Sequence, residues 1–210
     1  MAGRPPGSSA NGKQRLLDAC WDLLVELPVG ERLTISAVCD KAGCTPPTLY
    51  HHFGDLAALE RAASRRAHMA WSEDLESACA SITDPEERLL ERSRAYLQWA
   101  DKHVDAYHVL FSQPRKSQDP HAQGMEAPGF QALMSDLGEI HDLAISDTAL
   151  LPLAFAYWSG IHGLAGLSVT VPFFPKKAQE SALAIMTHSF ISHASVGESR
   201  DSMSCLRVAS

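Results

Sequence analysis

Residues 34–53, TISAVCDKAGCTPPTLYHHF, decide the fold of the N-terminal part of this chain. Ile35, Val38 and Cys39 recur at the spacing of a helix face. Ala42-Gly43 then interrupts the pattern, as a helix end does when it contains a residue free to adopt positive φ. The stretch therefore begins with one short helix and a tight turn.

A second short helix is predicted directly after this turn. Thr45 is suited to the N-cap, and Pro46 to the first helical position, where a missing N–H costs nothing. Leu49 and Phe53 are four residues apart and are expected to face the core. Two short helices joined through a glycine turn form a helix-turn-helix, whose second helix lies in a DNA major groove. The residues expected to face outward are Thr48, Tyr50, His51 and His52.

The run AGCTPPTLYHHF resembles the DNA-binding signature of the TetR (tetracycline-repressor-like) family of transcriptional regulators. That family has Ala-Gly, a small capping residue, a variable pair and then Leu-Tyr-x-His-Phe. The sequence departs from the family at Leu56, where a phosphate-binding lysine is usual, and at Pro47, where a small, flexible residue is usual. The resemblance covers about the first third of the chain. The matching residues of the last segment are Leu49, Tyr50, His52 and Phe53.

The resemblance implies a cytoplasmic, ligand-responsive regulator and not an enzyme, with no cofactor and no metal. It implies a repressor that a lipophilic or aromatic small molecule releases from a palindromic operator in double-stranded DNA. The second helix has no Arg, Asn or Gln for bidentate base contacts, so its side chains are expected to contact mainly phosphate oxygens. Thymine methyl contacts or DNA shape would then supply much of the specificity. The predicted DNA-binding residues are Thr34, Thr45, Pro46, Pro47, Thr48, Tyr50, His51 and His52.

The rest of the chain reads as helical, because it contains no alternating run of β-branched residues. Asp55 and Asp84-Pro85 are signals for helix starts. The expected fold is all-α, with a three-helix helix-turn-helix domain followed by a larger helical ligand-binding and dimerisation domain. A long loop is expected over residues 113–129, which have no helical period. The predicted divisions are a disordered arm at 1–12, the DNA-binding domain at 13–54, the larger domain at 55–194 and a disordered tail at 195–210.

The net charge of −7 is unevenly distributed. Residues 1–68 hold eight Lys and Arg against seven Asp and Glu, and residues 69–210 hold ten against eighteen. The N-terminal part can therefore approach phosphates without strong repulsion, although its basic excess is small.

The larger predicted domain carries aromatic and histidine residues on several helices, which suggests an apolar pocket with a few polar groups. Trp158-x-x-x-His162-Gly163 places an indole and an imidazole on one helix face. This run resembles a Trp-His-Gly motif in the ligand domain of one TetR subgroup. Taken alone, each residue is better explained by core packing, except His162, which either a ligand or a neighbouring carbonyl explains. The candidate ligand-binding residues are Trp71, Tyr96, Trp99, His103, Tyr107, Phe111, Met134, His141, Trp158 and His162.

Residues 148–174 contain no Asp, Glu, Lys or Arg, a length that could span a membrane. Their many Gly and Ser residues suit close helix contact better than lipid, so no membrane partner is expected. One recognition helix contacts only a few base pairs, so a second copy is needed for specific affinity. In the resembled family the last two large helices form the dimer, which corresponds here to residues 148–171 and 175–194.

The five cysteines are odd in number and scattered, and no signal peptide is evident, which indicates a reduced cytoplasmic protein. Cys39 and Cys44 with His51 and His52 suggest zinc, but adjacent histidines on a helix diverge by about 100° and the cysteine spacing is unsuitable. The alternative functions are an all-α ligand-binding protein without DNA affinity, or a metal-dependent enzyme that uses the helical-domain histidines. The sequence has no paired metal motif to support the enzyme.

Overall fold

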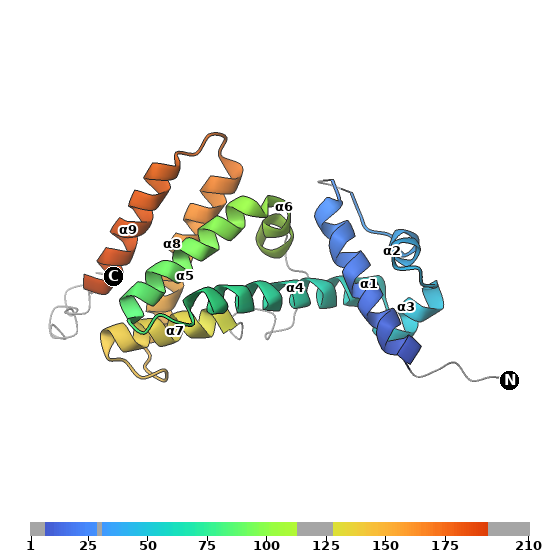
Figure 1. The fold of residues 1–210 in the computed structure, drawn as a ribbon, viewed down its shortest axis with the longest axis horizontal. Coiled ribbons are helices and arrows are strands. Elements are labelled where there is room, and N and C mark those ends of the chain that lie inside the picture. Colours follow the sequence, from blue (N-terminus) through green and yellow to red (C-terminus); the bar gives the residue numbers. More distant parts are fainter. Residues whose placement is uncertain (1–6, 29–30, 113–127, 193–210) are drawn as a thin grey trace, which may run out of the picture. The chain divides into compact units, whose positions relative to one another are not determined.

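The computed structural model describes residues 7–28, 31–112 and 128–192. Every element in these ranges is a helix, which confirms the all-α prediction (Figure 1). The chain divides into two compact units, and the division falls within the long helix α4. The helices are α1 (Gly7–Glu26), α2 (Ile35–Ala42), α3 (Pro46–Phe53), α4 (Leu56–Cys79), α5 (Pro85–Lys102), α6 (Val104–Tyr107), the π-helical turn η1 (His108–Ser112), α7 (Pro128–His141), α8 (Leu150–Thr170) and α9 (Lys176–Ser192).

The first unit contains the described residues up to Asp74 and those from His103 to Ser112. In it, α1 packs against α2 and α3, and the first part of α4 completes a shared core. Leu16, Leu49 and Leu59 are fully buried there, one from each of three helices. Burying a side chain of this size stabilises a fold by roughly 1.5–3 kcal/mol, so the short α2 and α3 depend on this core.

The second unit contains Leu75–Lys102 and the described residues from Pro128 onward. Here α5 packs against α7, α8 and α9. The hydroxyl of Tyr157, whose side chain is 1 % exposed, lies 2.8 Å from Ser93 Oγ and 3.0 Å from Thr187 Oγ1. Burial raises the pKa of Tyr157. Because a buried hydroxyl needs partners, this chain of hydrogen bonds fixes how α5, α8 and α9 meet.

Both predicted helix starts are confirmed. Asp55 Oδ1 accepts a hydrogen bond from the N–H of Ala58 at 2.6 Å, and Asp84 Oδ2 accepts one from the N–H of Glu87 at 3.3 Å. These bonds satisfy backbone donors that the first turn of a helix leaves open.

The first helix begins at Gly7, six residues before the expected start at Lys13, so part of the predicted disordered arm is helical. Gly12 lies in this additional segment, and α1 approaches α3 there. A Cβ at this position would lie 3.5 Å from Thr48 Cγ2 and 3.6 Å from His52 Nε2. Residues 1–6, most of the predicted 113–129 loop and the predicted tail lie outside the described residues.

The charge-free stretch forms α8, and α9 follows it. The buried positions of α9 are Gln179, Leu183 and Thr187, and Thr187 Oγ1 lies 3.0 Å from the Tyr157 hydroxyl on α8. Ile185, on another face of α9, is 69 % exposed.

By length and composition, α8 is the one helix of the described ranges that could cross a membrane. Of the most apolar 18-residue segment of α8, 28 % is buried within this chain. A core helix of a soluble protein passes the same test, so the observation is weak evidence for a span.

Candidate DNA-binding and ligand-binding sites

The predicted turn between α2 and α3 is confirmed. Thr34 caps α2, and its Oγ1 accepts a hydrogen bond from the N–H of Ala37 at 3.2 Å. Gly43 has φ 57° and ψ 40°, the left-handed conformation that favours glycine. The N–H of Gly43 donates to Asp40 O at 3.2 Å, and that of Cys44 to Cys39 O at 2.9 Å. This pair of bonds closes α2 and directs the chain into α3.

Thr45 occupies the N-cap position of α3 as predicted, but its side chain does not cap the helix. Pro46 and Pro47 carry no N–H, and the N–H of Thr48 donates to the carbonyl oxygen of Thr45 at 2.9 Å. The Thr45 hydroxyl instead lies 3.1 Å from the Thr48 hydroxyl. Because its first two helical positions have no N–H, the start of α3 has few backbone donors for a phosphate, and side chains must make most contacts.

The outward face of α3 is narrower than predicted. Tyr50 is 50 % exposed and His51 is exposed, whereas Leu49 is fully buried, all as expected. Thr48 and His52, which were also expected to face outward, are half-buried because α1 approaches them at Gly12. Tyr50 and His51 are thus the most accessible polar side chains of the middle of the helix.

Ion pairs hold the supporting helices of the first unit together. Lys41 on α2 donates to Glu26 Oε1 at 3.0 Å and lies 3.6 Å from Asp22 Oδ2, both on α1. The hydrogen bond with Glu26, followed by the two nearby carboxylates, raises the pKa of Lys41. Arg66 on α4 donates to Asp18 at 2.6 Å. These exposed pairs contribute orientation more than stability.

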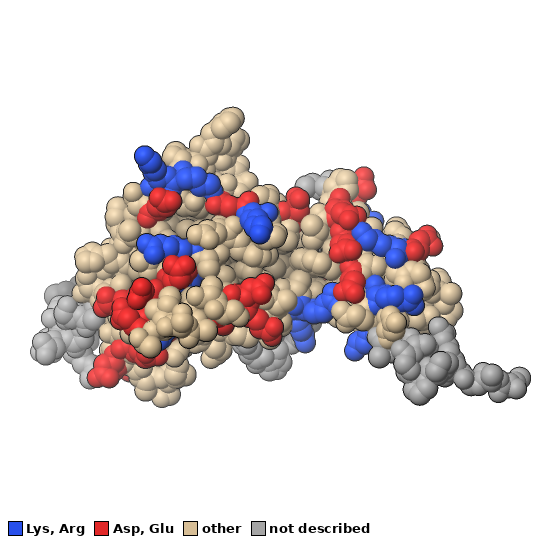
Figure 2. Space-filling model, viewed as in Figure 1, with Lys and Arg blue, Asp and Glu red and all other residues tan. Residues whose placement is uncertain are grey.

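Acidic and basic side chains are interspersed over the described residues on the face that Figure 2 shows. This agrees with the small basic excess in the sequence of the N-terminal part. Leu56, which stands where the resembled family usually has lysine, packs half-buried against the core of the first unit. That position therefore cannot hold a phosphate in this chain, and steering toward DNA must come from other groups.

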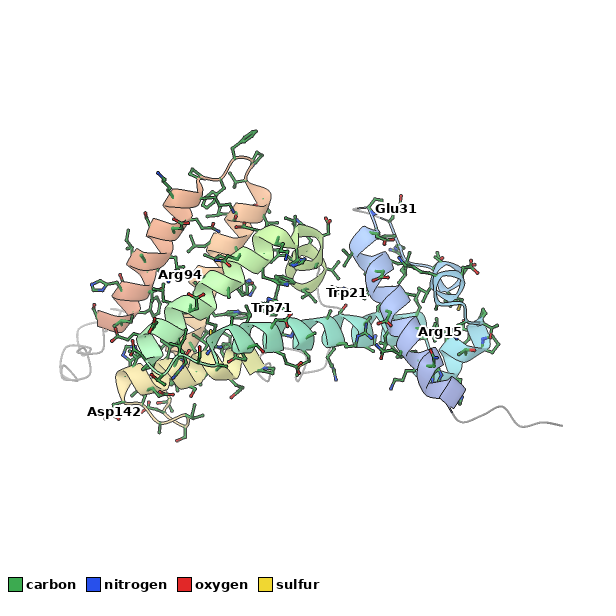
Figure 3. All side chains as sticks on the ribbon, in the orientation of Figure 1. Arg15, Trp21, Glu31, Trp71, Arg94 and Asp142 are labelled. Atoms are coloured by element: carbon green, nitrogen blue, oxygen red, sulfur yellow. The ribbon has the colours of Figure 1, made fainter. Side chains whose placement is uncertain are left out.

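The candidate ligand-binding residues fall in both units, and each unit brings some of them together. In the first unit, the ring of Phe111 lies 5.2 Å from that of Trp71 and 5.3 Å from that of Tyr107 (Trp71 is labelled in Figure 3). His68, which the sequence analysis missed, lies 5.3 Å from Trp71. Its spacing of three residues from Trp71 on one helix was the available signal. His103 is exposed just before α6.

In the second unit, Tyr96 on α5 and His162 on α8 share a hydrogen bond. The Tyr96 hydroxyl lies 2.9 Å from His162 Nδ1, and the Trp158 ring lies 4.6 Å from the imidazole. Phe130 and Phe155 extend this group, with ring centroids 5.8 Å and 6.1 Å from that of Trp158. Phe155 was missed, although it precedes Trp158 by three residues on the same helix.

The remaining candidates of the second unit lie on α5 and α7. Met134 on α7 is 7 % exposed, and Trp99 on α5 is half-buried. His141 is half-buried at the end of α7 and is hydrogen-bonded to the backbone of Phe190, while its Nε2 has no hydrogen-bond partner among the described residues. Burial lowers the pKa of His141, with a smaller opposing effect from Phe190.

A metal site is not evident in the described ranges, where no group of three or more His, Cys, Asp or Glu side chains is placed to hold an ion. Cys39 is 2 % exposed, and Cys44 is half-buried at the helix-turn-helix turn. Burial raises the pKa of Cys20 to about 12 and also raises that of Cys79, so these two thiols stay protonated at neutral pH.

Comparison with known proteins gives a family match for part of the chain. The tetracyclin repressor-like C-terminal domain family matches residues 89–189. A search of curated proteins gave no match. Whether the chain has the Trp-His-Gly subgroup's ligand motif stays a prediction, because this family match does not address it.

Several solved structures share the fold over most of their length. A TetR-family transcriptional regulator from Streptomyces coelicolor is 17 % identical, with 88 % of each chain covered and a TM-score of 0.62. RolR, solved with the ligand resorcinol, is 15 % identical, with coverage of 91 % of this chain and 97 % of that one and a TM-score of 0.62.

NalD of Pseudomonas aeruginosa, the secondary repressor of the MexAB-OprM multidrug efflux pump, is 18 % identical to this chain. Coverage is 86 % of this chain and 96 % of NalD, with a TM-score of 0.57. At these identities the similarity establishes the shared fold.

Proposed function

We propose, from the premise that this chain belongs to the TetR family of transcriptional regulators, that it binds a palindromic operator and is released by a small ligand. The observation that carries this proposal is the capped helix-turn-helix, with its glycine turn and the exposed Tyr50 and His51 on α3. A second helix presented in this way enters a major groove. The family fold is that of a non-enzymatic regulator, so the metal-dependent enzyme is not favoured.

The proposed DNA-binding surface consists of the outward face of α3, its N-cap residue Thr45, and Thr34 at the start of α2. Tyr50 and His51 donate to phosphate oxygens or base edges from the middle of the helix. Pro46 and Pro47 present apolar ring carbons at its start, which suit thymine methyl groups. Thr34 and Thr45, which are exposed, and Thr48 and His52, which are half-buried, contact the DNA backbone at the margins of this surface.

A homodimer supplies the second recognition helix. Regulators of this family are dimers, and an interface through residues 148–171 and 175–194 is supported by apolar side chains that a single chain leaves uncovered. Leu151 and Leu167 on α8 are 40 % and 46 % exposed, and Ile185 on α9 is 69 % exposed. A buried patch of such residues is the usual core of a permanent dimer interface.

The ligand site is proposed in the second unit around Tyr96, Trp158 and His162. Aromatic rings form its apolar walls, while the Tyr96 hydroxyl and the imidazole supply a polar pair. The ligand class that fits is a lipophilic or aromatic molecule with a hydroxyl group. The shared fold with RolR, whose structure holds resorcinol, supports the same class.

Release follows if ligand and operator favour different arrangements of the two DNA-binding domains in the dimer. Each then lowers the affinity for the other by the same factor. The helix α4 begins directly after the DNA-binding domain, proposed to end near residue 54, and is the first helix of the larger domain proposed from residue 55. Repression, which NalD performs, is the proposed outcome of operator binding in the cytoplasm.

A mobility-shift titration with the DNA flanking the gene for this protein tests operator binding. We expect a specific shift at a palindrome that survives competitor DNA and is lost in Tyr50→Ala, with Arg94→Ala on α5 as the matched exposed control. If no flanking palindrome is shifted by the folded protein, the proposal of a regulator acting at its own locus fails.

Resorcinol is a suitable first probe of the ligand site. We expect it to quench tryptophan fluorescence in the natural protein and to do so less in Trp158→Phe, because Trp158 borders the proposed site. Equal quenching in Trp71→Phe and in the natural protein is the control, since Trp71 belongs to the first unit. If Trp71→Phe alone abolishes the response, the proposed ligand site is misplaced.

A further inference from the structure

Cys39 and Cys44 stand at the two ends of the turn that closes α2. The N–H of Cys44 donates to Cys39 O at 2.9 Å. Between the two cysteines in sequence, the N–H of Gly43 donates to Asp40 O at 3.2 Å. These are the two bonds of a Schellman motif, in which the side chains of the outer pair commonly pack together. The two cysteines are therefore neighbours in space, although four residues lie between them in sequence.

The backbone hydrogen bond limits the distance between the two cysteines. Because Cys44 N lies 2.9 Å from Cys39 O, standard bond lengths keep the two Cα atoms within about 6.8 Å of each other. Protein disulfides span roughly 4.4–6.8 Å between Cα atoms. Consistent with proximity, the pKa of the Cys39 thiol is raised first by its burial and then by the neighbouring Cys44 and Asp40.

The two cysteines differ in access to solvent. Cys39 is 2 % exposed in the core, whereas Cys44 is half-buried at the surface of the turn. Nη2 of Arg15, which projects from α1 (Figure 3), donates to Cys44 Sγ at 3.7 Å. An oxidant in solution therefore reacts first with Cys44, which lies next to a positive charge. Cys39 is covered by the core and is not directly accessible.

We propose that Cys44 and Cys39 form a reversible redox pair that controls the helix-turn-helix. A peroxide transfers one oxygen atom to the Cys44 thiol, giving a sulfenic acid and leaving as an alcohol or water. The Cys39 sulfur then attacks the Cys44 sulfur. The S–S bond forms, and the sulfenic hydroxyl leaves as water with the proton of the Cys39 thiol. A dithiol reductant reverses the step by thiol–disulfide exchange.

Closure of this bond would disturb the start of α3. In the reduced protein Cys44 Sγ contacts Ala42 O at 3.6 Å and Gly12 O at 3.9 Å, as well as Arg15. Turning the sulfur toward Cys39 breaks these contacts one residue before Thr45. This consequence rests on the proposed DNA-binding function, because it expects oxidised protein to bind the operator more weakly.

The disulfide itself is tested without DNA. The full-length protein is treated with limiting hydrogen peroxide, free thiols are blocked, and tryptic peptides are weighed. Because Lys41 separates the cysteines, trypsin leaves them on two peptides that only a disulfide joins. We expect the joined pair to have lost two hydrogen atoms, to separate with dithiothreitol, to be absent in Cys44→Ala and to persist in Cys79→Ala. Sulfenic or sulfinic acid at Cys44 with a free Cys39 thiol, or pairing with another cysteine, overturns the proposal.

Control of DNA binding is tested with the same samples. Operator affinity should fall about tenfold or more on oxidation, the order of one lost contact in a DNA site, and recover with dithiothreitol. Cys44→Ala should bind the operator with the affinity of the reduced protein, and peroxide should not change that affinity. If protein that carries the disulfide binds the operator with unchanged affinity, the proposed redox control of DNA binding is wrong. Reduced protein that binds no operator contradicts the proposed function instead, while the peptide result still decides whether the pair forms.

Discussion

Asp136 on α7, with 2 % of its side chain exposed, accepts a hydrogen bond from Arg88 Nε at 2.7 Å. The same carboxylate accepts two more from Arg92, whose Nη1 also pairs with Glu76. Burial alone would lower the pKa of Arg92, but its bonds with Glu76 and Asp136 raise it. This buried network joins the end of α4 to α5 and α7.

Asp136→Asn should therefore destabilise the fold strongly. The substitution removes the buried charge that Arg88 and Arg92 share and leaves Arg92 only the partly exposed Glu76, and breaking a buried pair costs about 3–5 kcal/mol. The free energy of unfolding from urea titration measures this. Glu139→Gln is the control, because the Glu139 side chain is 52 % exposed and its bridge to Arg88 at 2.9 Å should be worth less than about 1 kcal/mol. Equal losses in the two variants would contradict the assigned role of burial.

Two glycines of the first unit should respond in opposite directions to alanine. Gly43→Ala should lower stability by about 1 kcal/mol or more, because an L side chain is strained at φ 57°. Gly12→Ala should raise it by about 0.5–1 kcal/mol, because Gly12 is helical and a Cβ there meets its neighbours at ordinary contact distance. Thermal melting compares both with the natural protein, and a loss in Gly12→Ala would show that α1 and α3 cannot separate slightly.

Neighbouring residues of α3 should separate folding from DNA binding. Leu49→Ala should cost about 2–5 kcal/mol of stability, because Leu49 is fully buried. Tyr50→Ala should change stability by less than about 0.5 kcal/mol while weakening operator binding, because half of Tyr50 is exposed. Calorimetry and mobility shifts on the same preparations check both. Intact operator binding by Tyr50→Ala would remove Tyr50 from the proposed surface.

His141 should make the fold less stable in mild acid. Its folded pKa is lowered by burial, so its contribution to stability is present above the unfolded value of about 6.5 and is lost as pH falls through the folded pKa. The free energy of unfolding should drop more between about pH 7.5 and about pH 5 in the natural protein than in His141→Asn. His188→Asn, at an exposed position of α9, is the control for replacing a surface histidine.

Ile185→Glu should favour the monomer. A charge in the proposed dimer interface must be desolvated on association, which costs several kcal/mol when it is unpaired. Analytical ultracentrifugation measures the change. Arg94→Glu, at an exposed position of α5, should leave the assembly unchanged. A dimer of unaltered affinity in Ile185→Glu would place the interface on another surface.

The sequence by itself determined the helical class, the turn at Gly43 and the burial of Leu49, because these follow from local backbone preference and helical spacing. The cap and start signals at Asp55 and Asp84-Pro85 belong to the same class. Such features depend on a few consecutive residues, and their hydrogen bonds close within one turn.

Only the tertiary structure decided which side chains are covered and which groups meet. In the tertiary structure α1 extends to Gly7, and Thr48 and His52 are half-buried. The packed face of α9 includes Thr187, and Cys44 lies beside Cys39 and Arg15. The candidate ligand residues are divided between two units. These outcomes depend on contacts between segments far apart in the chain, and such contacts leave no periodic signal in either segment.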